Sequence, residues 1–163
     1  MTCQDRTAEI AARIGILLKE WGWTLAVAES CTGGLVGSAI TDISGSSDYF
    51  LGGVIAYANR IKRDMLGVEE RLLEAHGAVS EEVAGAMARG VREALTVDVG
   101  LAVTGIAGPT GGTPEKPVGT VFIAASTPSQ ERVEHHRWSS DRKGNKRLSA
   151  EAVLRLLEEM LPG

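Results

Sequence analysis

The feature that most constrains the fold is a short apolar run that passes into a turn of small residues and then into a helical segment. The run is LAVA (residues 25–28), the turn is ESCTGG (residues 29–34), and the helical segment is residues 35–43. A buried strand followed by a helix is the building unit of α/β proteins. The turn therefore lies at the carboxyl end of a strand, where open α/β sheets place their ligands.

The turn ESCTGG allows three interpretations from its residues alone. Ser30 or Cys31 could be a nucleophile exposed on a sharp turn, and the N–H groups of Thr32, Gly33 and Gly34 could face a phosphate or an oxyanion. Alternatively, Thr32 caps the following helix and the two glycines only relieve backbone strain. The turn is thus a catalytic elbow, an anion cradle or a capped structural turn.

Periodicity predicts the remaining elements. Apolar spacing favours a first helix from Thr7 to Trp21, with Thr7 as its N-cap and Gly22 as its stop. Further helices are predicted at residues 60–66 and 69–75, in 77–95 with Ser80 as N-cap, and from Asp141 or Lys146 to Met160. Strands are predicted at residues 24–28, 49–57, 97–103, 118–126 and 131–138. This order predicts a three-layer α/β/α sandwich with a mixed, mostly parallel sheet of about five strands.

Length and composition favour one domain over residues 1–163. A chain of 163 residues supports one substantial core, and no linker or repeat interrupts it. Hydrophobic residues make up 44% but aromatic residues only 4%, so the core must be aliphatic. The small residues Ala84, Ala86 and Ala88 predict close packing of their helix, and with the GGV segment they are also compatible with a homo-oligomer, either a dimer or a trimer.

Charge and cysteine usage exclude several classes of partner. The net charge of −4 argues against broad binding to nucleic acid, because that mode relies on clustered Lys and Arg. The basic stretch RKGNKR (residues 142–147) suits one small phosphate equally well. Two cysteines without a CxxC motif, and the His135–His136 pair on opposite faces of a strand, predict no metal site. The absence of a signal peptide or membrane-length apolar run predicts a cytoplasmic protein with no membrane partner.

Two further segments carry polar groups after predicted strands. The loop TGIAGPTGG (residues 104–112) could wrap a ligand with its backbone or be a flexible hairpin connection, and it lacks the Lys-Ser/Thr pair of a Walker A loop. The segment YANRIKR offers the phenol of Tyr57, the amide of Asn59 and the amine of Lys62. A lysine buried near a serine hydroxyl can act as a general base, whereas an isolated lysine is more often solvated.

With these motifs assembled, the sequence resembles the C-terminal domain family of the competence/damage-inducible protein CinA. The resemblance covers nearly the whole chain and rests on AESCTGG, GGVIAYANRIKRDMLGV, HGAVSEEVA and AVTGIAGPTGGTPEKPVGTVFIA. The family's larger N-terminal domain, which looks like a molybdopterin-binding fold, is not in this sequence. Stand-alone family members are nicotinamide mononucleotide (NMN) deamidases, so the resemblance implies hydrolysis of the NMN carboxamide without a cofactor.

The resemblance also implies roles for individual residues. It places the nucleophile on Ser30 and the other catalytic groups on Lys62 and Tyr57. In amide hydrolysis these would serve as the base and as a proton-relay or orienting group, respectively. The implied substrate-binding residues are Cys31, Thr32, Gly33, Gly34, Asn59, Thr104, Gly105, Gly108 and Arg142. Cys31 remains an alternative nucleophile, because a thiolate is intrinsically more reactive than a hydroxyl. A non-catalytic module that binds a nucleotide or a competence-related partner is the alternative function, since fold is inherited more firmly than activity.

Overall fold

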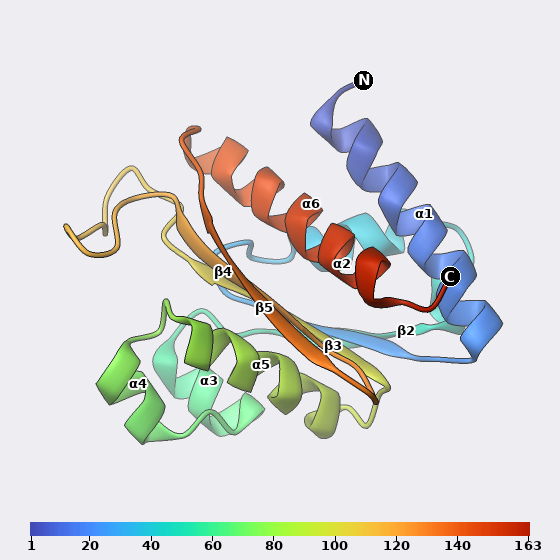
Figure 1. The fold of residues 1–163 in the computed structure, drawn as a ribbon, viewed down its shortest axis with the longest axis horizontal. Coiled ribbons are helices and arrows are strands. Elements are labelled where there is room, and N and C mark those ends of the chain that lie inside the picture. Colours follow the sequence, from blue (N-terminus) through green and yellow to red (C-terminus); the bar gives the residue numbers. More distant parts are fainter.

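The computed structural model describes all 163 residues as one five-stranded sheet covered by helices on both faces (Figure 1). The strands are β1 (Leu25–Glu29), β2 (Phe50–Ile55), β3 (Val99–Gly105), β4 (Thr120–Ser126) and β5 (Glu131–Arg137). The helices are α1 (Cys3–Trp21), α2 (Leu35–Thr41), α3 (Asn59–Leu66), α4 (Glu70–His76), α5 (Glu81–Ala94) and α6 (Arg142–Met160), with a short 3-10 turn at Ser46–Asp48. The predicted three-layer α/β/α sandwich is confirmed.

The sheet has the strand order β2-β1-β3-β4-β5. Strand β1 lies parallel to both β2 and β3, whereas β4 is antiparallel to β3 and β5 is antiparallel to β4. Four of the five strands therefore point in one direction, and only β4 is reversed. The carboxyl ends of β1, β2 and β3 meet at one edge of the sheet, which is where a ligand site is expected in such folds.

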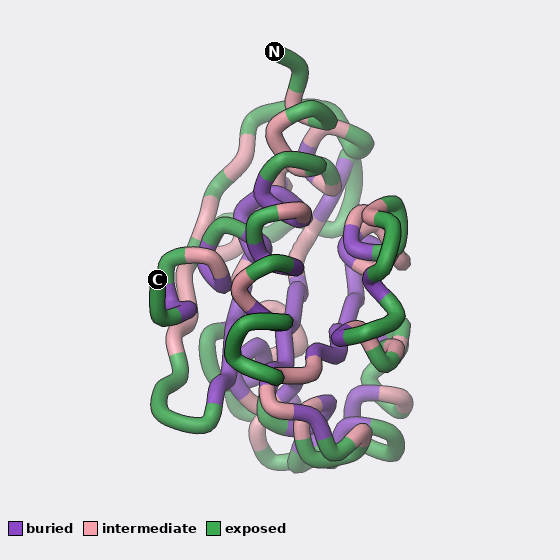
Figure 2. The backbone as a smooth tube through the Cα atoms, turned by 90° about the vertical axis from the view of Figure 1, so that its right-hand side faces the viewer, coloured by how far each residue is buried: buried purple, intermediate pink, exposed green.

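Buried residues follow the strands and the inner sides of the helices (purple in Figure 2), and alternation along the strands divides the core between the two faces of the sheet. Larger aliphatic side chains point toward α1, α2 and α6, and alanines point toward α3, α4 and α5. The first set from the strands is Leu25, Val27, Val99, Leu101, Val103, Val121 and Ile123, and the second is Ala26, Ala28, Ala102 and Ala124. Small side chains on the second face allow α5 to approach the sheet closely.

The close approach of α5 is visible at two glycines. A Cβ added at Gly90 would lie 1.9 Å from the carbonyl oxygen of Leu66, and one at Gly100 would lie 2.1 Å from that of Ala88. Neither backbone oxygen can move away without disturbing its own helix. The prediction of close packing along α5 is confirmed, and its N-cap is Ser80 as predicted, because the Ser80 side chain accepts the N–H of Val83.

The first helix begins earlier than the sequence predicted. Thr7 is not its N-cap, because the helix begins at Cys3 and is capped by Thr2. The Thr2 side chain accepts the N–H of Asp5, and the Asp5 carboxylate accepts the N–H of Thr2, so a capping box initiates the helix. The predicted stop at Gly22 is correct, since Gly22 adopts a left-handed conformation with φ of 65°.

Three strands, β2, β4 and β5, are shorter than predicted, whereas β1 and β3 keep the predicted length but lie one and two residues later in the chain. The predicted strand at residues 49–57 is narrowed to Phe50–Ile55, and Tyr49 and Tyr57 lie outside it. Helix α6 begins at Arg142 with Asp141 as its N-cap, which selects the earlier of the two predicted starts. None of the helices combines the length and the apolar composition needed to span a bilayer.

Candidate active site

A cavity of about 310 Å³ lies where β1 and β3 end and where α3 and α6 begin. One side is formed by the loop between β3 and β4, which projects beyond the sheet in Figure 1. The lining residues are Ser30, Cys31, Tyr57, Lys62, Ala78, Val79, Thr104, Gly105, Ile106, Ala107, Gly108, Thr110, Gly111 and Arg142. Eight of the twelve site residues predicted from the sequence line this cavity, although they come from four separate segments.

The central contact of the cavity joins Ser30 and Lys62. The backbone N–H of Ser30 donates to the carbonyl of Val103, which fixes the serine at the end of β1 beside β3. Lys62 lies on α3 with only 1% of its surface exposed, and its Nζ lies 3.1 Å from Ser30 Oγ. The predicted contact between a lysine and the serine hydroxyl is therefore present in the structure. The alternative prediction, that Lys62 is a solvated surface residue, is wrong.

The other contacts of Lys62 orient its amine. Nζ also donates to the carbonyl oxygens of Ala56 at 2.8 Å and Tyr57 at 3.1 Å. A carbonyl oxygen can only accept, so a neutral amine must direct both of its hydrogens to these two groups. Its lone pair is then left for the hydroxyl of Ser30. This arrangement suits removal of the serine proton.

The charge state of Lys62 is governed by its burial. Burial lowers the pKa of the Lys62 amine below its ordinary value, because the ammonium form loses its hydration. No carboxylate forms an ion pair with Lys62, and its three hydrogen-bond partners are uncharged. A lysine that loses its proton more readily than a surface lysine is a better general base near neutral pH.

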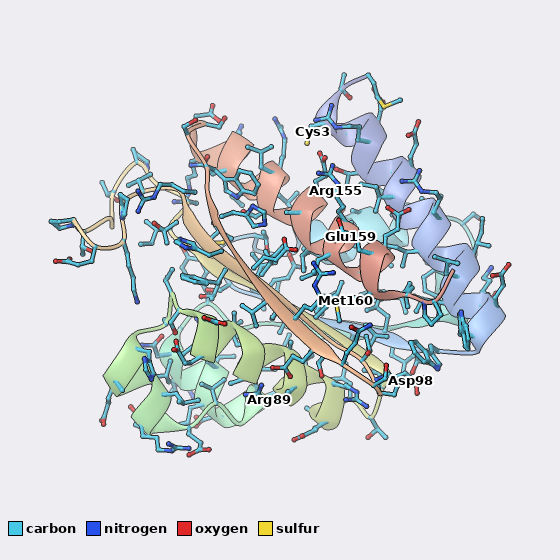
Figure 3. All side chains as sticks on the ribbon, viewed as in Figure 1. Cys3, Arg89, Asp98, Arg155, Glu159 and Met160 are labelled. Atoms are coloured by element: carbon cyan, nitrogen blue, oxygen red, sulfur yellow. The ribbon has the colours of Figure 1, made fainter.

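Cys31 lines the same cavity, but burial keeps its thiol protonated, whereas burial favours loss of the proton from Lys62. Burial raises the pKa of the Cys31 thiol to about 11, so at neutral pH only about one molecule in ten thousand carries the reactive thiolate. The other cysteine, Cys3, lies at the start of α1 beside α6 and away from this cavity (Figure 3), and its thiol donates to Glu151 at 2.9 Å. The hydroxyl of Ser30, not the thiol of Cys31, has the amine as its neighbour.

The N–H groups of the ESCTGG turn divide into two sets. Gly33 donates to the carbonyl of Ser30, and Gly34 donates to the carboxylate of Glu29. Cys31 and Thr32 lie outside the regular elements, and their N–H groups donate to no protein oxygen. The free donors are therefore those of Cys31 and Thr32, and the predicted donors Gly33 and Gly34 are occupied within the protein.

Helix α2 is capped by a residue that the sequence analysis did not consider. Glu29, which is 2% exposed, accepts the N–H groups of Gly34 at 3.2 Å, Val36 at 2.9 Å and Gly37 at 3.0 Å. The prediction that Thr32 caps this helix is wrong, because its hydroxyl oxygen is buried without any hydrogen-bond partner. A glutamate at the last strand position before a helix was the available signal, since a carboxylate is favoured at a helix N-terminus.

Four predicted site residues do not line the cavity. These are Thr32, Gly33, Gly34 and Asn59. Both glycines have positive φ, 60° and 113°, so they shape the turn that leads into α2. Asn59 is the exposed first residue of α3 and forms no side-chain hydrogen bond.

Tyr57 and Arg142 meet at the mouth of the cavity. Arg142, the first residue of α6, donates through Nη1 to the carbonyl of Gly108 at 2.7 Å, and its Nη2 lies 3.4 Å from the Tyr57 hydroxyl. The Tyr57 hydroxyl makes no hydrogen bond to Ser30 or Lys62, and its side chain belongs to a residue that is 63% exposed. The tyrosine therefore joins the proton-transfer pair only through its backbone carbonyl.

The remaining predicted residues shape the cavity wall. The hydroxyl of Thr104 donates to the carbonyl of Ala78 at 2.8 Å, which holds the connection between α4 and α5 beside the cavity. A Cβ at Gly105 would lie 2.6 Å from Val121, and Gly108 has a φ of 85°. The same Cβ at Gly105 would lie 2.9 Å from the carbonyl oxygen of Thr120, so both positions favour glycine.

The lining of the cavity contains basic side chains and no acidic ones. It contains the side chains of Lys62 and Arg142 and no carboxylate, although the whole chain carries a net charge of −4. No group of three or more His, Cys, Asp or Glu side chains is arranged to hold a metal ion. The arrangement offers a hydroxyl, an amine, free backbone donors and an arginine for an anionic group.

The fold and this site define an α/β domain with a buried Ser-Lys pair at the carboxyl end of its sheet. Comparison with known families agrees with the resemblance noted in the sequence. Residues 7–161 match the model described as the CinA C-terminal domain, and the chain belongs to that family.

Individual relatives cover most of this chain. A CinA-like protein from Syntrophobacter fumaroxidans is 53% identical over 148 residues, and one from Salinibacter ruber is 53% identical over 145 residues. These alignments cover 91% and 89% of this chain but only 35% of either relative, so the chain spans about a third of the length of these curated relatives.

Solved structures of similar length share the fold. The competence/damage inducible protein CihA from Agrobacterium tumefaciens has a TM-score of 0.93 at 38% identity, and 95% of each chain is covered. A competence-damaged protein (CinA) superfamily protein from Escherichia coli has a TM-score of 0.87 at 31% identity, covering 97% of this chain and 90% of that one. The five-stranded architecture is therefore that of the CinA superfamily.

Proposed function

We propose that this chain hydrolyses the carboxamide of NMN to give nicotinate mononucleotide and ammonia. The observation that carries the proposal is the 3.1 Å contact between Lys62 Nζ and Ser30 Oγ at a buried site. The activity itself comes from the resemblance to stand-alone members of the CinA C-terminal domain family. The proposed step would serve the recycling of pyridine nucleotides.

In the first half-reaction, Ser30 Oγ attacks the carboxamide carbon while its proton passes to Lys62 Nζ. The carbonyl oxygen becomes a tetrahedral oxyanion, for which the free N–H groups of Cys31 and Thr32 are the candidate donors. The N–H of the residue after the serine holds the same place in the oxyanion hole of α/β-hydrolases. The intermediate then expels ammonia, which takes the proton from Lys62, and an ester with Ser30 remains.

In the second half-reaction, water replaces ammonia at the same position. Lys62 is neutral again after ammonia leaves, so it accepts a proton from the attacking water. The second tetrahedral intermediate expels Ser30 Oγ, which recovers a proton from Lys62. The products are nicotinate mononucleotide and the free enzyme, and the reaction consumes one water without a metal or organic cofactor.

The charge of the cavity supports an anionic substrate. NMN carries a 5'-phosphate, and Arg142 is the one guanidinium in the lining. We assign the phosphate to Arg142, because an arginine fork suits phosphate oxygens and the glycine-rich loop leaves room for them. Tyr57, which lies next to Arg142, is assigned to orienting the substrate and not to proton relay.

The test is an ammonia-release assay over NMN, nicotinamide, nicotinamide riboside and NAD, with EDTA present. Wild-type protein is expected to release one ammonia for each nicotinate mononucleotide formed. Ser30→Ala should lose this activity, and Cys31→Ser should keep it because the thiol is protonated at neutral pH. Activity that survives Ser30→Ala but not Cys31→Ser would move the nucleophile to Cys31.

A thermal-shift measurement separates catalysis from binding alone. A protein that is stabilised by NMN but releases no ammonia would be the nucleotide-binding module considered from the sequence. Under the proposed mechanism, Lys62→Met should still bind NMN but release no ammonia, since the proposed role of the lysine is proton transfer. If correctly folded wild-type protein neither binds nor hydrolyses NMN, then NMN is not its ligand.

A further inference from the structure

Tyr57 is the one aromatic residue in the lining of the cavity, and its side chain takes no part in either half of the core. It is 63% exposed, whereas the other tyrosine of the chain, Tyr49, is 2% exposed. No aromatic ring of the protein stacks on Tyr57, and no cation of the protein lies over its ring. An exposed ring that neither packs nor pairs within the protein is available to a ligand.

Two contacts fix the position of Tyr57 between the two ends of the site. Its backbone carbonyl accepts a hydrogen bond from Lys62 Nζ at 3.1 Å, and its hydroxyl lies 3.4 Å from Arg142 Nη2. The residue therefore extends from the Ser30–Lys62 pair to the arginine that is assigned to the phosphate. In NMN, the pyridinium ring and the ribose separate the carboxamide from the phosphate in the same order. The phenol ring thus lies beside the place that the pyridinium ring occupies.

The pyridinium ring of NMN carries a positive charge, because its nitrogen is bonded to the ribose. The cavity offers this cation no carboxylate, and its charged side chains, Lys62 and Arg142, are basic. Four carbonyl oxygens of the lining already accept side-chain hydrogen bonds, namely those of Tyr57, Ala78, Ala107 and Gly108. The face of an aromatic ring is negative and attracts a cation placed over it. The ring of Tyr57 is therefore the group of the lining that suits the charge of the pyridinium.

We infer that Tyr57 determines specificity for the positive charge of the pyridinium ring, which lies over its phenol ring. The inference rests on the proposed function, because it takes the carboxamide at Ser30 and the phosphate at Arg142 as fixed points. A neutral ring of the same size is then bound less tightly than the cationic one. This preference also suits the chemistry, since the nitrogen of a neutral dihydropyridine donates electrons to the carboxamide and makes its carbon a poor target for Ser30.

The first test compares two ligands by titration calorimetry in a Ser30→Ala background, where neither ligand is turned over under the proposed mechanism. The ligands are NMN and reduced NMN, which has the same carboxamide, ribose and phosphate on an uncharged dihydropyridine ring. We expect NMN to bind about 2- to 30-fold more tightly than reduced NMN, the range that a cation–π contact corresponds to. Equal affinities for the two ligands overturn the inference.

The second test separates the ring face of Tyr57 from its hydroxyl, in the same background. Tyr57→Phe keeps the face and loses the contact with Arg142, whereas Tyr57→Leu keeps apolar volume and loses the face. The preference for NMN over reduced NMN should survive in Tyr57→Phe and disappear in Tyr57→Leu. A role in packing or shape alone would weaken both ligands equally. A preference that Tyr57→Leu retains therefore overturns the inference.

The variants at position 57 leave the rest of the site in place. The contact from Lys62 is made to the backbone carbonyl, so each variant keeps it, and the exposed side chain supports no core packing. Circular dichroism checks the folding, and Tyr57→Met decides the question if Tyr57→Leu does not fold. Trp21→Leu is the matched control, because Trp21 is another exposed aromatic residue, at the end of α1, and should leave both affinities unchanged.

The outcomes distinguish this inference from the proposed function. Ammonia release from NMN by wild type tests the function, and the ligand preference of the Tyr57 variants tests the inference. If wild type hydrolyses NMN but Tyr57→Leu keeps the preference, the function stands and the inference fails. If the preference depends on the Tyr57 ring but wild type releases no ammonia, the inference stands and the function fails. Both fail if the folded protein does not bind NMN.

Discussion

The sharpest prediction concerns Lys62→Met, compared with wild type over a range of pH. Lys62 is 1% exposed and has no carboxylate partner, and burial lowers the pKa of its amine below the ordinary 10.5. The unfolded chain therefore holds its proton at pH values where the folded protein has already released it. Between the folded pKa and 10.5, the free energy of unfolding of wild type must rise with pH.

The size of this effect follows from the shift itself. The free energy of unfolding of wild type, relative to Lys62→Met, should rise by at most about 1.4 kcal/mol for each pH unit. The total rise equals about 1.4 kcal/mol for each unit by which burial lowers the pKa of Lys62. Loss of the hydrogen bonds to the carbonyls of Ala56 and Tyr57 adds a constant offset that does not depend on pH.

The assay is urea unfolding of wild type and Lys62→Met at a series of pH values from neutral to mildly alkaline. Lys143→Met, which removes an exposed lysine, supplies the background effect of losing one positive charge. The pH dependence of ammonia release provides a second measure, because serine activation in the proposed mechanism needs the neutral amine. A stability difference that is flat with pH would refute the claim that Lys62 is a destabilised ammonium.

Three further predictions test the structure around this pair. Glu29→Gln should lower the free energy of unfolding by about 1–3 kcal/mol, because an amide nitrogen would then face a backbone N–H. The exposed Glu81→Gln serves as its control in urea unfolding, and equal stability of the two variants would contradict the capping role. Arg142→Gln should raise the KM for NMN by roughly tenfold or more, with a smaller change in kcat, because the proposed charge-assisted contact to the phosphate is lost. An unchanged KM in steady-state assays would place the phosphate elsewhere. Gly90→Ala should cost about 1–3 kcal/mol in thermal or urea unfolding because its methyl group meets the carbonyl of Leu66, and wild-type stability would show that α5 can shift.

The layered fold was predictable because its information is local. The run VGLAV (residues 99–103) is apolar throughout, as strands buried on both faces are, and helices flank the strands in the order that an α/β sandwich needs. Boundaries were less predictable. The start of α1 depends on a reciprocal capping box between Thr2 and Asp5. Thr7 is also a suitable N-cap residue by type, so the sequence predicted a later start.

The site was predictable in its residue types but not in its connections. Ser30 and Lys62 are 32 positions apart in the sequence. Only the folded chain shows that the Lys62 side chain reaches the carbonyl of Ala56, directly after β2, and so lies beside Ser30. The role of Glu29 was not predictable because Glu29 is the last residue of β1 and caps the helix from within that strand, whereas a capping side chain normally belongs to the residue directly before the helix. The long side chain reaches donors five to eight residues later.

The position of Glu29 also explains how an acidic chain forms a cavity without a carboxylate. Its carboxylate directly precedes Ser30, yet it is directed into the N-terminus of α2, where three N–H groups offset its charge. The cavity side of the turn is left with free N–H groups, the amine of Lys62 and the guanidinium of Arg142. Before binding, burial without a counter-ion favours the neutral amine. In the proposed reaction, the charge of an anionic substrate stabilises the ammonium that forms as Ser30 attacks, so we expect NMN to be hydrolysed faster than nicotinamide riboside, which carries the same carboxamide without the phosphate.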